Sequence, residues 1–238
     1  MKTSFSRPWF APRTVVLPTG RGWLAILGGV GLSVWAIAVA CHPFLAVEER
    51  FPDGPGTVDL LCVEGWSSES VIDAVAEAYK SGKYGRIAVT GGPTQSRERL
   101  IGFASYAALG AFRLERRGVP ADRIIVSEPA YADRRRTLND ILELRRTLRM
   151  AGVEPCRLQI FSTSVHTRRT RLLYRRVFGT GTEIRALALP PEDYDPEHWW
   201  ATSEGLKTVV MESISLAFDS LAPVPALEAI EPVNLTGR

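Results

Sequence analysis

The segment of residues 162–169 (STSVHTRR) holds the densest group of chemically active side chains: hydroxyls, one imidazole and two guanidinium groups. It follows a short apolar run and precedes an amphipathic one, so we expect it to form the turn between a strand and a helix. An anion or a general base can occupy such a turn, because a helix N-terminus carries a partial positive charge. A lone histidine is more often structural than catalytic, but the position of His166 in this turn favours proton transfer.

Three neighbours of His166 could bind an anion. Thr163 and Ser164 offer hydroxyl and backbone groups, and Arg169 offers a guanidinium group that suits carboxylate or phosphate. In the helix predicted over residues 167–177, Arg169 borders the apolar side, whereas three other arginines cluster on another side. Arg169 is therefore the preferred anion-binding candidate of this helix.

A second basic segment, residues 133–140 (DRRRTLND), follows another apolar run and opens another predicted helix. Charge runs usually form solvated faces, and we expect at least two of its arginines to do so. Arg136 and Thr137 stand at the expected helix start, where they could contact the same anion.

Two glycine-containing turns complete the set of candidate site residues. Glu64 follows the first apolar run and could transfer a proton, while Gly65 would let a ligand approach the backbone; a simple polar turn is an equal alternative. Gly91 and Gly92 follow the second run and could supply free N–H groups, although a plain turn is the more common role of paired glycines.

The elements that must position these residues alternate along the chain. Short apolar runs, the length of buried strands, occupy residues 58–63, 86–90, 124–127, 158–161 and 184–189. Amphipathic stretches, typical of helices, occupy residues 71–79, 97–117, 137–150, 167–177 and 201–220. This alternation predicts an α/β fold: a Rossmann-like three-layer α/β/α sandwich with a five-stranded, mostly parallel sheet of order 3-2-1-4-5. Glu64 and His166 would then meet at one edge of the sheet, in the crevice between the first and fourth strands.

Residues 23–41 form a stretch of 19 residues without any charge. At about 1.5 Å per residue a helix over this stretch is about 28 Å long, close to the thickness of a bilayer core. The first 21 residues contain four basic residues and no acid, which predicts a cytoplasmic N-terminus and a periplasmic or extracellular domain at the inner or plasma membrane. An uncleaved anchor is favoured, but Ala38-Val39-Ala40-Cys41 also leaves signal-peptide cleavage and lipidation of Cys41 open.

These patterns divide the chain into five parts. They are a basic cytoplasmic segment (1–21), a transmembrane anchor (22–42), a linker (43–56), the α/β domain (57–221) and a Pro-rich tail (222–238). Without the four basic residues of the first segment, 25 of the 29 basic residues face 26 acidic ones. This near balance argues against a nucleic-acid partner.

The remaining motifs exclude several common chemistries. The chain contains no G-x-x-x-x-G-K-[ST], no G-x-G-x-x-G after the first run and no G-x-S-x-G, so P-loop, ordinary dinucleotide-binding and common serine-hydrolase functions lose support. Cys62 and Cys156 belong to no metal-spaced cluster, and we expect two buried or half-buried free thiols. Residues 193–200 (DYDPEHWW) lack a second histidine, so no metal site is predicted, and the cofactor is unknown.

Several features together form a recognisable pattern: the N-terminal apolar segment, the Thr90-Gly91-Gly92 turn, Gly118-Val119-Pro120, Arg136-Thr137 and Thr163-Ser164-x-His166-x-x-Arg169. This pattern, over residues 58–221, resembles the ElyC/SanA/YdcF family of bacterial proteins. The resemblance implies a Rossmann-like domain and a link to the cell envelope. The chain differs from the family at Glu64-Gly65-Trp66, where members have Leu-Gly-Gly, and at residues 137–140 (TLND), where they favour Thr-x-Glu-Asn.

Three functions from different classes remain open. The first is a membrane-anchored protein that binds or acts on a small anionic, phosphorylated envelope precursor, free or linked to lipid, with His166 or Glu64 as the proton carrier. The second is a non-catalytic sensor of a nucleotide or small metabolite. The third is an interaction module that uses Trp66, Trp199 and Trp200 as contacts.

Overall fold

The computed structural model describes residues 16–55, 57–94, 102–129 and 135–225. The chain divides into two compact units, Met1–Val39 and Ala40–Arg238. The second unit contains the α/β domain.

The domain is built on a five-stranded parallel sheet of order β3-β2-β1-β4-β5. Its strands are β1 (Val58–Glu64), β2 (Tyr84–Thr90), β3 (Ile124–Ser127), β4 (Arg157–Thr163) and β5 (Glu183–Leu189). The predicted strand order and the α/β class are therefore confirmed. Strand order reverses between β1 and β4, which places the predicted crevice at their carboxyl ends.

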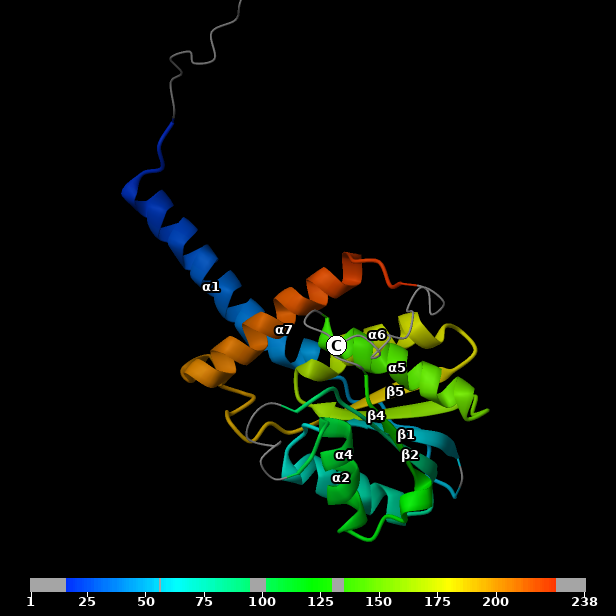
Figure 1. The fold of residues 1–238 in the computed structure, drawn as a ribbon. Helices are drawn as coiled ribbons and strands as arrows, with labels where there is room; N and C mark the ends of the chain where they lie inside the picture. Colours follow the sequence, from blue (N-terminus) through cyan, green and yellow to red (C-terminus); the bar gives the residue numbers. More distant parts are fainter. Residues whose placement is uncertain (1–15, 56, 95–101, 130–134, 226–238) are drawn as a thin grey trace, which may run out of the picture. The chain divides into compact units, whose positions relative to one another are not determined.

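Helices cover both faces of the sheet (Figure 1). They are α2 (Glu69–Lys80) and α4 (Tyr106–Glu115) on one face, and α5 (Arg136–Met150) and α6 (His166–Phe178) on the other. Successive side chains of β1 point to opposite faces, so Leu60 and Cys62 pack in the core under α5 and α6, whereas Leu61 and Val63 pack in the core under α2 and α4. Burial on both faces explains why the strands appear in the sequence as continuous apolar runs.

Two helices begin later than the sequence predicts. The helix predicted over residues 97–117 begins only at Tyr106; residues 102–105 are not helical, and residues 97–101 lie outside the described residues. The Ser105 hydroxyl accepts a hydrogen bond from the Ala108 N–H, and this cap sets the helix start. The last helix, α7 (Ser203–Leu221), follows a short 3-10 turn (Trp199–Ala201) and is capped by Thr202.

The segment predicted as a linker lies along the edge strand β5. The Glu49 N–H donates to the Ala186 carbonyl at 2.7 Å, and the Ala188 N–H donates to the Val47 carbonyl at 2.7 Å. Val47 and Phe51 are buried in the two cores. This pairing covers the free edge of β5.

The helix α1 (Gly20–Leu45) contains 26 residues and is long and apolar enough to cross a membrane. Residues 20–39 belong to the first unit, whereas its final residues belong to the second, where His42 and Leu45 are buried. The predicted basic segment and the predicted tail lie mostly outside the described residues, because residues 1–15 and 226–238 are not among them.

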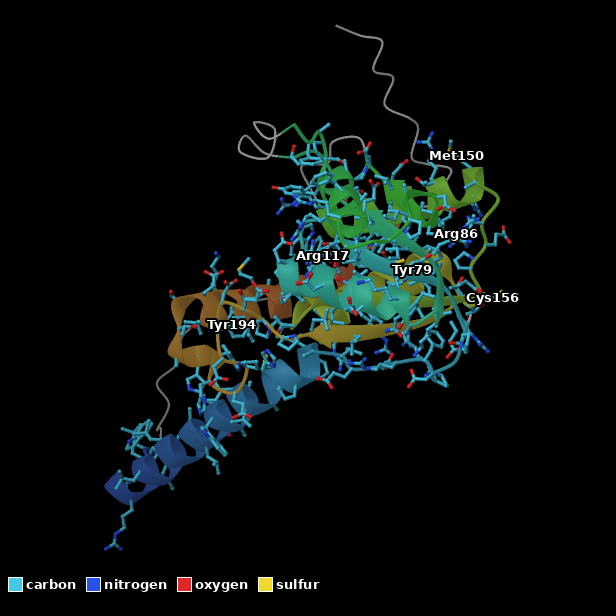
Figure 2. All side chains as sticks on the ribbon, turned by 90° about the horizontal axis from the view of Figure 1, so that it is seen from below. Tyr79, Arg86, Arg117, Met150, Cys156 and Tyr194 are labelled. Carbon is cyan, nitrogen blue, oxygen red and sulfur yellow. The ribbon has the colours of Figure 1, made fainter. Side chains whose placement is uncertain are left out.

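All three cysteines are unpaired. Cys62 is buried in the middle of β1, as expected, but the prediction of a buried or half-buried Cys156 is wrong because this residue is exposed. Cys156 precedes β4 at the amino-terminal edge of the sheet, where no helix covers it. Figure 2 shows it at the opposite end of the domain from Tyr194.

Gly65 allows α4 to approach the end of β1. A β-carbon at this position would lie 2.0 Å from the Tyr106 carbonyl oxygen and 2.6 Å from its carbonyl carbon. These are backbone atoms of a capped helix, so they cannot move aside without displacing α4. A glycine is therefore needed at position 65 for the packing of α4 against the end of β1, whether or not the residue also contacts a ligand.

We expect Gly65→Ala to lower the free energy of unfolding by about 3 kcal/mol, the upper range for overpacking a rigid site. Gly181→Ala is the matched control, because a β-carbon there meets nothing within 4 Å; it should change stability by less than about 0.5 kcal/mol. Thermal and urea unfolding followed by circular dichroism would measure both. Equal stabilities of the two variants would contradict this packing role.

Candidate functional site

The candidate site lies where β1 and β4 end. Glu64 is the last residue of β1, and His166 is the first residue of α6, directly after the turn that follows β4. The His166 Nε2 atom lies 3.6 Å from the Glu64 Oε1 atom. The structure thus brings together the two predicted proton carriers, as the strand order requires.

The turn before His166 has a strained residue. Ser164 has a φ of 43°, in the left-handed region that non-glycine residues rarely adopt. Its N–H donates to the Leu189 carbonyl, and its own carbonyl accepts from the Thr167 N–H and, at 2.6 Å, from the Thr167 hydroxyl. These three bonds hold the tight turn that brings His166 to the edge of the sheet.

Glu212 of α7 holds the other side of the imidazole ring. Its Oε1 atom lies 3.0 Å from His166 Nδ1 and 3.0 Å from Arg169 Nη2, while its Oε2 atom lies 2.8 Å from Arg169 Nε. Burial alone would raise the pKa of Glu212, but the hydrogen bonds from His166 and Arg169 outweigh it and hold the pKa at about 2. Glu212 is therefore ionised at neutral pH.

The His166 Nδ1 atom lies 3.0 Å from Glu212 Oε1, which can only accept a hydrogen bond, and 3.0 Å from Arg169 Nη2, which can only donate one. In the tautomer that pairs with Glu212, Nδ1 carries the proton and Nε2 presents a lone pair toward Glu64. The Trp66 ring meets the imidazole edge-on, with 5.6 Å between the ring centroids, and covers it from one side. A carboxylate that fixes one imidazole nitrogen and leaves the other available is the arrangement of a general base.

The Glu64 side chain is almost completely buried. Its Oε1 atom accepts from the Ser162 and Thr170 hydroxyls, each at 3.4 Å. Burial raises the pKa of Glu64, and the interaction with His166 and these hydrogen bonds oppose the rise only in part. A carboxyl group with a raised pKa is suited to donate a proton.

Two polar atoms at the centre of this cluster have no hydrogen-bond partner among the described residues. They are Glu64 Oε2 and His166 Nε2, and the two residues are only 6% and 9% exposed. Leaving a buried polar atom unpaired costs about 1–3 kcal/mol. Such atoms side by side indicate a place where a ligand or an ordered water completes the hydrogen bonding.

Asp140 is a further acid of the site, on the first turns of α5. Burial raises its pKa to about 7, the electrostatic interaction with Glu64 adds to this effect, and the interactions with Arg136 and His166 oppose it. Arg136 itself is exposed and makes no salt bridge with any described residue. Its charge therefore acts on Asp140 without a direct ion pair.

Arg169, by contrast, is fully engaged. Besides Glu212, it contacts Asp219 of α7 at 3.4 Å and the Thr137 hydroxyl at 3.3 Å. Arg135 also contacts Asp219, at 3.1 Å. The guanidinium group of Arg169 thus joins α5, α6 and α7, and its charge is balanced by two carboxylates.

The Ser164 hydroxyl points to a different polar group. It lies 2.9 Å from His42 Nε2, near the end of α1, and 3.0 Å from the Tyr194 hydroxyl. Thr163 is the half-buried last residue of β4. The Ser164 hydroxyl therefore does not contact the cluster around Glu64, although Glu64 and Ser164 lie at the ends of neighbouring strands.

The remaining predicted residues, Gly91 and Gly92, follow β2. The Gly91 N–H donates to the Ser127 carbonyl, so it is not free, and a β-carbon at Gly91 would lie 2.7 Å from that of Tyr106. The Gly92 carbonyl accepts from the Tyr106 N–H. These contacts fix the start of α4. Asp133 and Arg134 of the predicted basic segment lie outside the described residues.

Sequence reasoning missed Glu212 and Asp219. One signal could have found them: from residue 208 to residue 221 these are the only charged residues, and they are seven positions apart, on one side of an otherwise uncharged helix. Two acids placed in that way require basic partners inside the fold. Within the described part of the chain, no group of three or more His, Cys, Asp or Glu side chains could hold a metal ion.

The raised pKa of Asp140 predicts a pH-dependent effect of Asp140→Asn. Because the folded-state pKa is about 7 and the ordinary value is 3.8, the folded domain favours the protonated acid, and ionisation destabilises it as pH rises between these values. The variant should match the parent near pH 4 and exceed its stability by about 2–4 kcal/mol at pH 8. Urea unfolding at several pH values would show this; a difference that stays constant would contradict it.

The chain was compared with protein-family models and with curated proteins. No family model matches it, and no curated protein matches it. The residues and contacts described above are the basis on which its function is inferred.

Proposed function

We propose that this chain is a membrane-anchored, extracytoplasmic α/β protein that binds an anionic, phosphorylated cell-envelope precursor and transfers a proton to or from it. The observation that carries the proposal is the position of His166 between two carboxylates of opposite character. Glu212 is ionised and fixes Nδ1, while Glu64 is buried, has a raised pKa and faces Nε2.

The two carboxylates give the site an acid and a base. With its Nδ1 proton held by Glu212, His166 can accept a proton at Nε2 from a water or a hydroxyl group of the ligand. Glu64, which keeps its proton more readily than an exposed glutamate, can donate one to a departing oxygen. The two unpaired atoms, Glu64 Oε2 and His166 Nε2, are where these transfers would occur.

Arg136 is the candidate anion contact, with Thr137 next to it in the chain, and Thr163 is a further ligand candidate at the end of β4. Arg136 stands at the N-terminus of α5, where the helix dipole also favours negative charge, and it makes no salt bridge with any described residue. Arg169 acts as a positioning residue in this scheme, because Glu212 and Asp219 already occupy its guanidinium group.

A sensor without turnover is the second candidate, and one observation favours it. An anion that competes with Glu212 and Asp219 for Arg169 would break contacts that hold α7 on α6. Ligand binding would then change the packing of α7. This function needs Arg169 but needs no proton transfer by His166.

Inorganic pyrophosphate is a suitable probe for the anion site. We expect Arg136→Ala to weaken its binding to the detergent-solubilised full chain at least tenfold, because one charge-assisted contact is lost. Arg149→Ala is the matched control, since it changes an exposed arginine at the far end of the same helix. Isothermal titration calorimetry measures the affinities; equal affinities of the two variants would contradict the role of Arg136.

His166→Gln separates turnover from binding. It should leave pyrophosphate affinity unchanged and lower hydrolysis of a chromogenic phosphate ester by about 10²–10⁴-fold, the usual contribution of a general base. Unchanged hydrolysis would contradict the proton-transfer role. If the parent chain hydrolyses no ester, and the parent and His166→Gln bind pyrophosphate with the same affinity, the result would favour the sensor function.

The proposed orientation can be tested through Cys156, which is exposed, whereas Cys62 is buried. In bacterial spheroplasts expressing the full chain, a membrane-impermeant maleimide should label the parent strongly and the Cys156→Ser variant weakly. The expected reason is the surplus of four basic residues before the apolar stretch, which retains the N-terminus in the cytoplasm. Labelling that appears only after lysis would contradict this orientation, because it would place Cys156 on the cytoplasmic side of the membrane.

A further inference from the structure

The outer face of α7 carries an apolar stripe. It consists of Leu206, Val210, Met211, Ile214, Phe218 and Leu221, which are between 41% and 88% exposed, and the Arg135 guanidinium group lies over the Phe218 ring, 5.7 Å from its centroid. Most of these residues follow one another at intervals of three or four positions, so they lie on one side of the helix. An apolar surface of this extent is unusual for a helix that faces water.

The charged residues of α7 lie either on its inner side or near its N-terminus. Glu212 and Asp219 face the domain and contact Arg169, and the exposed charges Glu204 and Lys207 both lie in its first two turns. From residue 208 to residue 221, the exposed surface of α7 therefore contains no charged residue. A solvated helix would carry its charges on this side.

We propose that the outer face of α7 rests on the lipid bilayer in which α1 is anchored. The surface would be an interfacial one: α7 would lie in the plane of the membrane boundary with its apolar stripe against the lipid chains. The proposal depends on α1 being a membrane span and does not depend on the ligand proposed for the site.

The position of Cys41 favours lipid over other occupants. Cys41 is the last residue of the uncharged stretch, where the chain leaves the bilayer core, and its Sγ atom lies 3.4 Å from the Ser213 hydroxyl in the middle of α7. Both residues belong to the second unit. The chain therefore emerges from the membrane beside the apolar stripe.

Neighbouring residues have the composition of a membrane boundary. Phe44 is exposed, and the Arg168 guanidinium group lies over its ring, 4.0 Å from the centroid, while also donating to the Phe44 carbonyl. Aromatic rings and long basic side chains are typical of this zone, where one end of the side chain is apolar and the other is hydrated. Phe44 and Arg168 extend the lipid-facing surface from α7 to the end of α1.

Site-directed spin labelling of the full chain in phospholipid nanodiscs tests the proposal. The background carries Cys41→Ser and Cys156→Ser, and Cys62 is fully buried. A nitroxide is attached at Ile214→Cys, with Glu77→Cys on α2 as the control, since Glu77 is highly exposed and lies on the other side of the sheet. Leu221→Cys is a second probe, because at 88% exposure its label cannot disturb packing.

We expect the two α7 labels to collide several-fold more often with oxygen, relative to a water-soluble nickel chelate, than the Glu77→Cys label does. Oxygen concentrates in the lipid chains and the chelate stays in water, so this ratio reports depth. Equal ratios at all three positions would overturn the proposal. Reduced collision with both reagents, together with dipolar broadening between labels, would overturn it in favour of a second copy of the chain as the occupant.

Discussion

The contact on which the site depends is the one between Glu212 and the pair formed by His166 and Arg169. It orients the imidazole ring, neutralises Arg169 and attaches α7 to α6. All of this happens through one carboxylate, which is mostly buried and keeps its charge because two donors converge on it. Without it, His166 would lose its orientation and Arg169 would keep only Asp219 as an acidic partner, at 3.4 Å. Removing one member of such a buried group generally costs about 3–5 kcal/mol, because the charge left behind is not compensated.

Most of the fold could be predicted from the sequence, because it follows from local patterns. Five apolar runs with intervening amphipathic stretches indicate the parallel α/β sheet, and a ligand crevice between the first and fourth strands, combined with right-handed crossovers, gives the strand order that places Glu64 beside His166. The start of α4 could not be predicted in the same way. Its boundary depends on the Ser105 cap and on the close approach of its backbone to Gly65, which are properties of packing. The same holds for Cys156, whose exposure depends on which end of the sheet the helices leave uncovered.

The candidate site could be predicted only for the residues that come from the turns of the sheet. Glu212 and Asp219 lie more than 40 positions after His166, on a helix whose place depends on tertiary contacts. The sequence suggested Arg169 as the preferred anion-binding residue of its helix, whereas the structure shows it paired with two carboxylates, and Arg136 makes no salt bridge with any described residue. Asp140 shows the same difficulty, because its raised pKa arises from burial and from the proximity of Glu64. Neither property can be inferred from the charged segment of residues 133–140 alone.

The two sides of helix α7 have different requirements, which constrain each other. Its inner side needs acids to meet Arg169 and His166, and its outer side needs apolar residues if it lies on lipid. Since the two sides belong to one rigid helix, a shift of α7 at the membrane boundary would also move Glu212 relative to His166. The site would then be most complete when α7 is seated on the bilayer, and its acid and base would be assembled next to the surface from which a lipid-linked phosphate would arrive. If α7 rests on lipid as proposed, its contact with the bilayer would help to position the carboxylate that orients the imidazole.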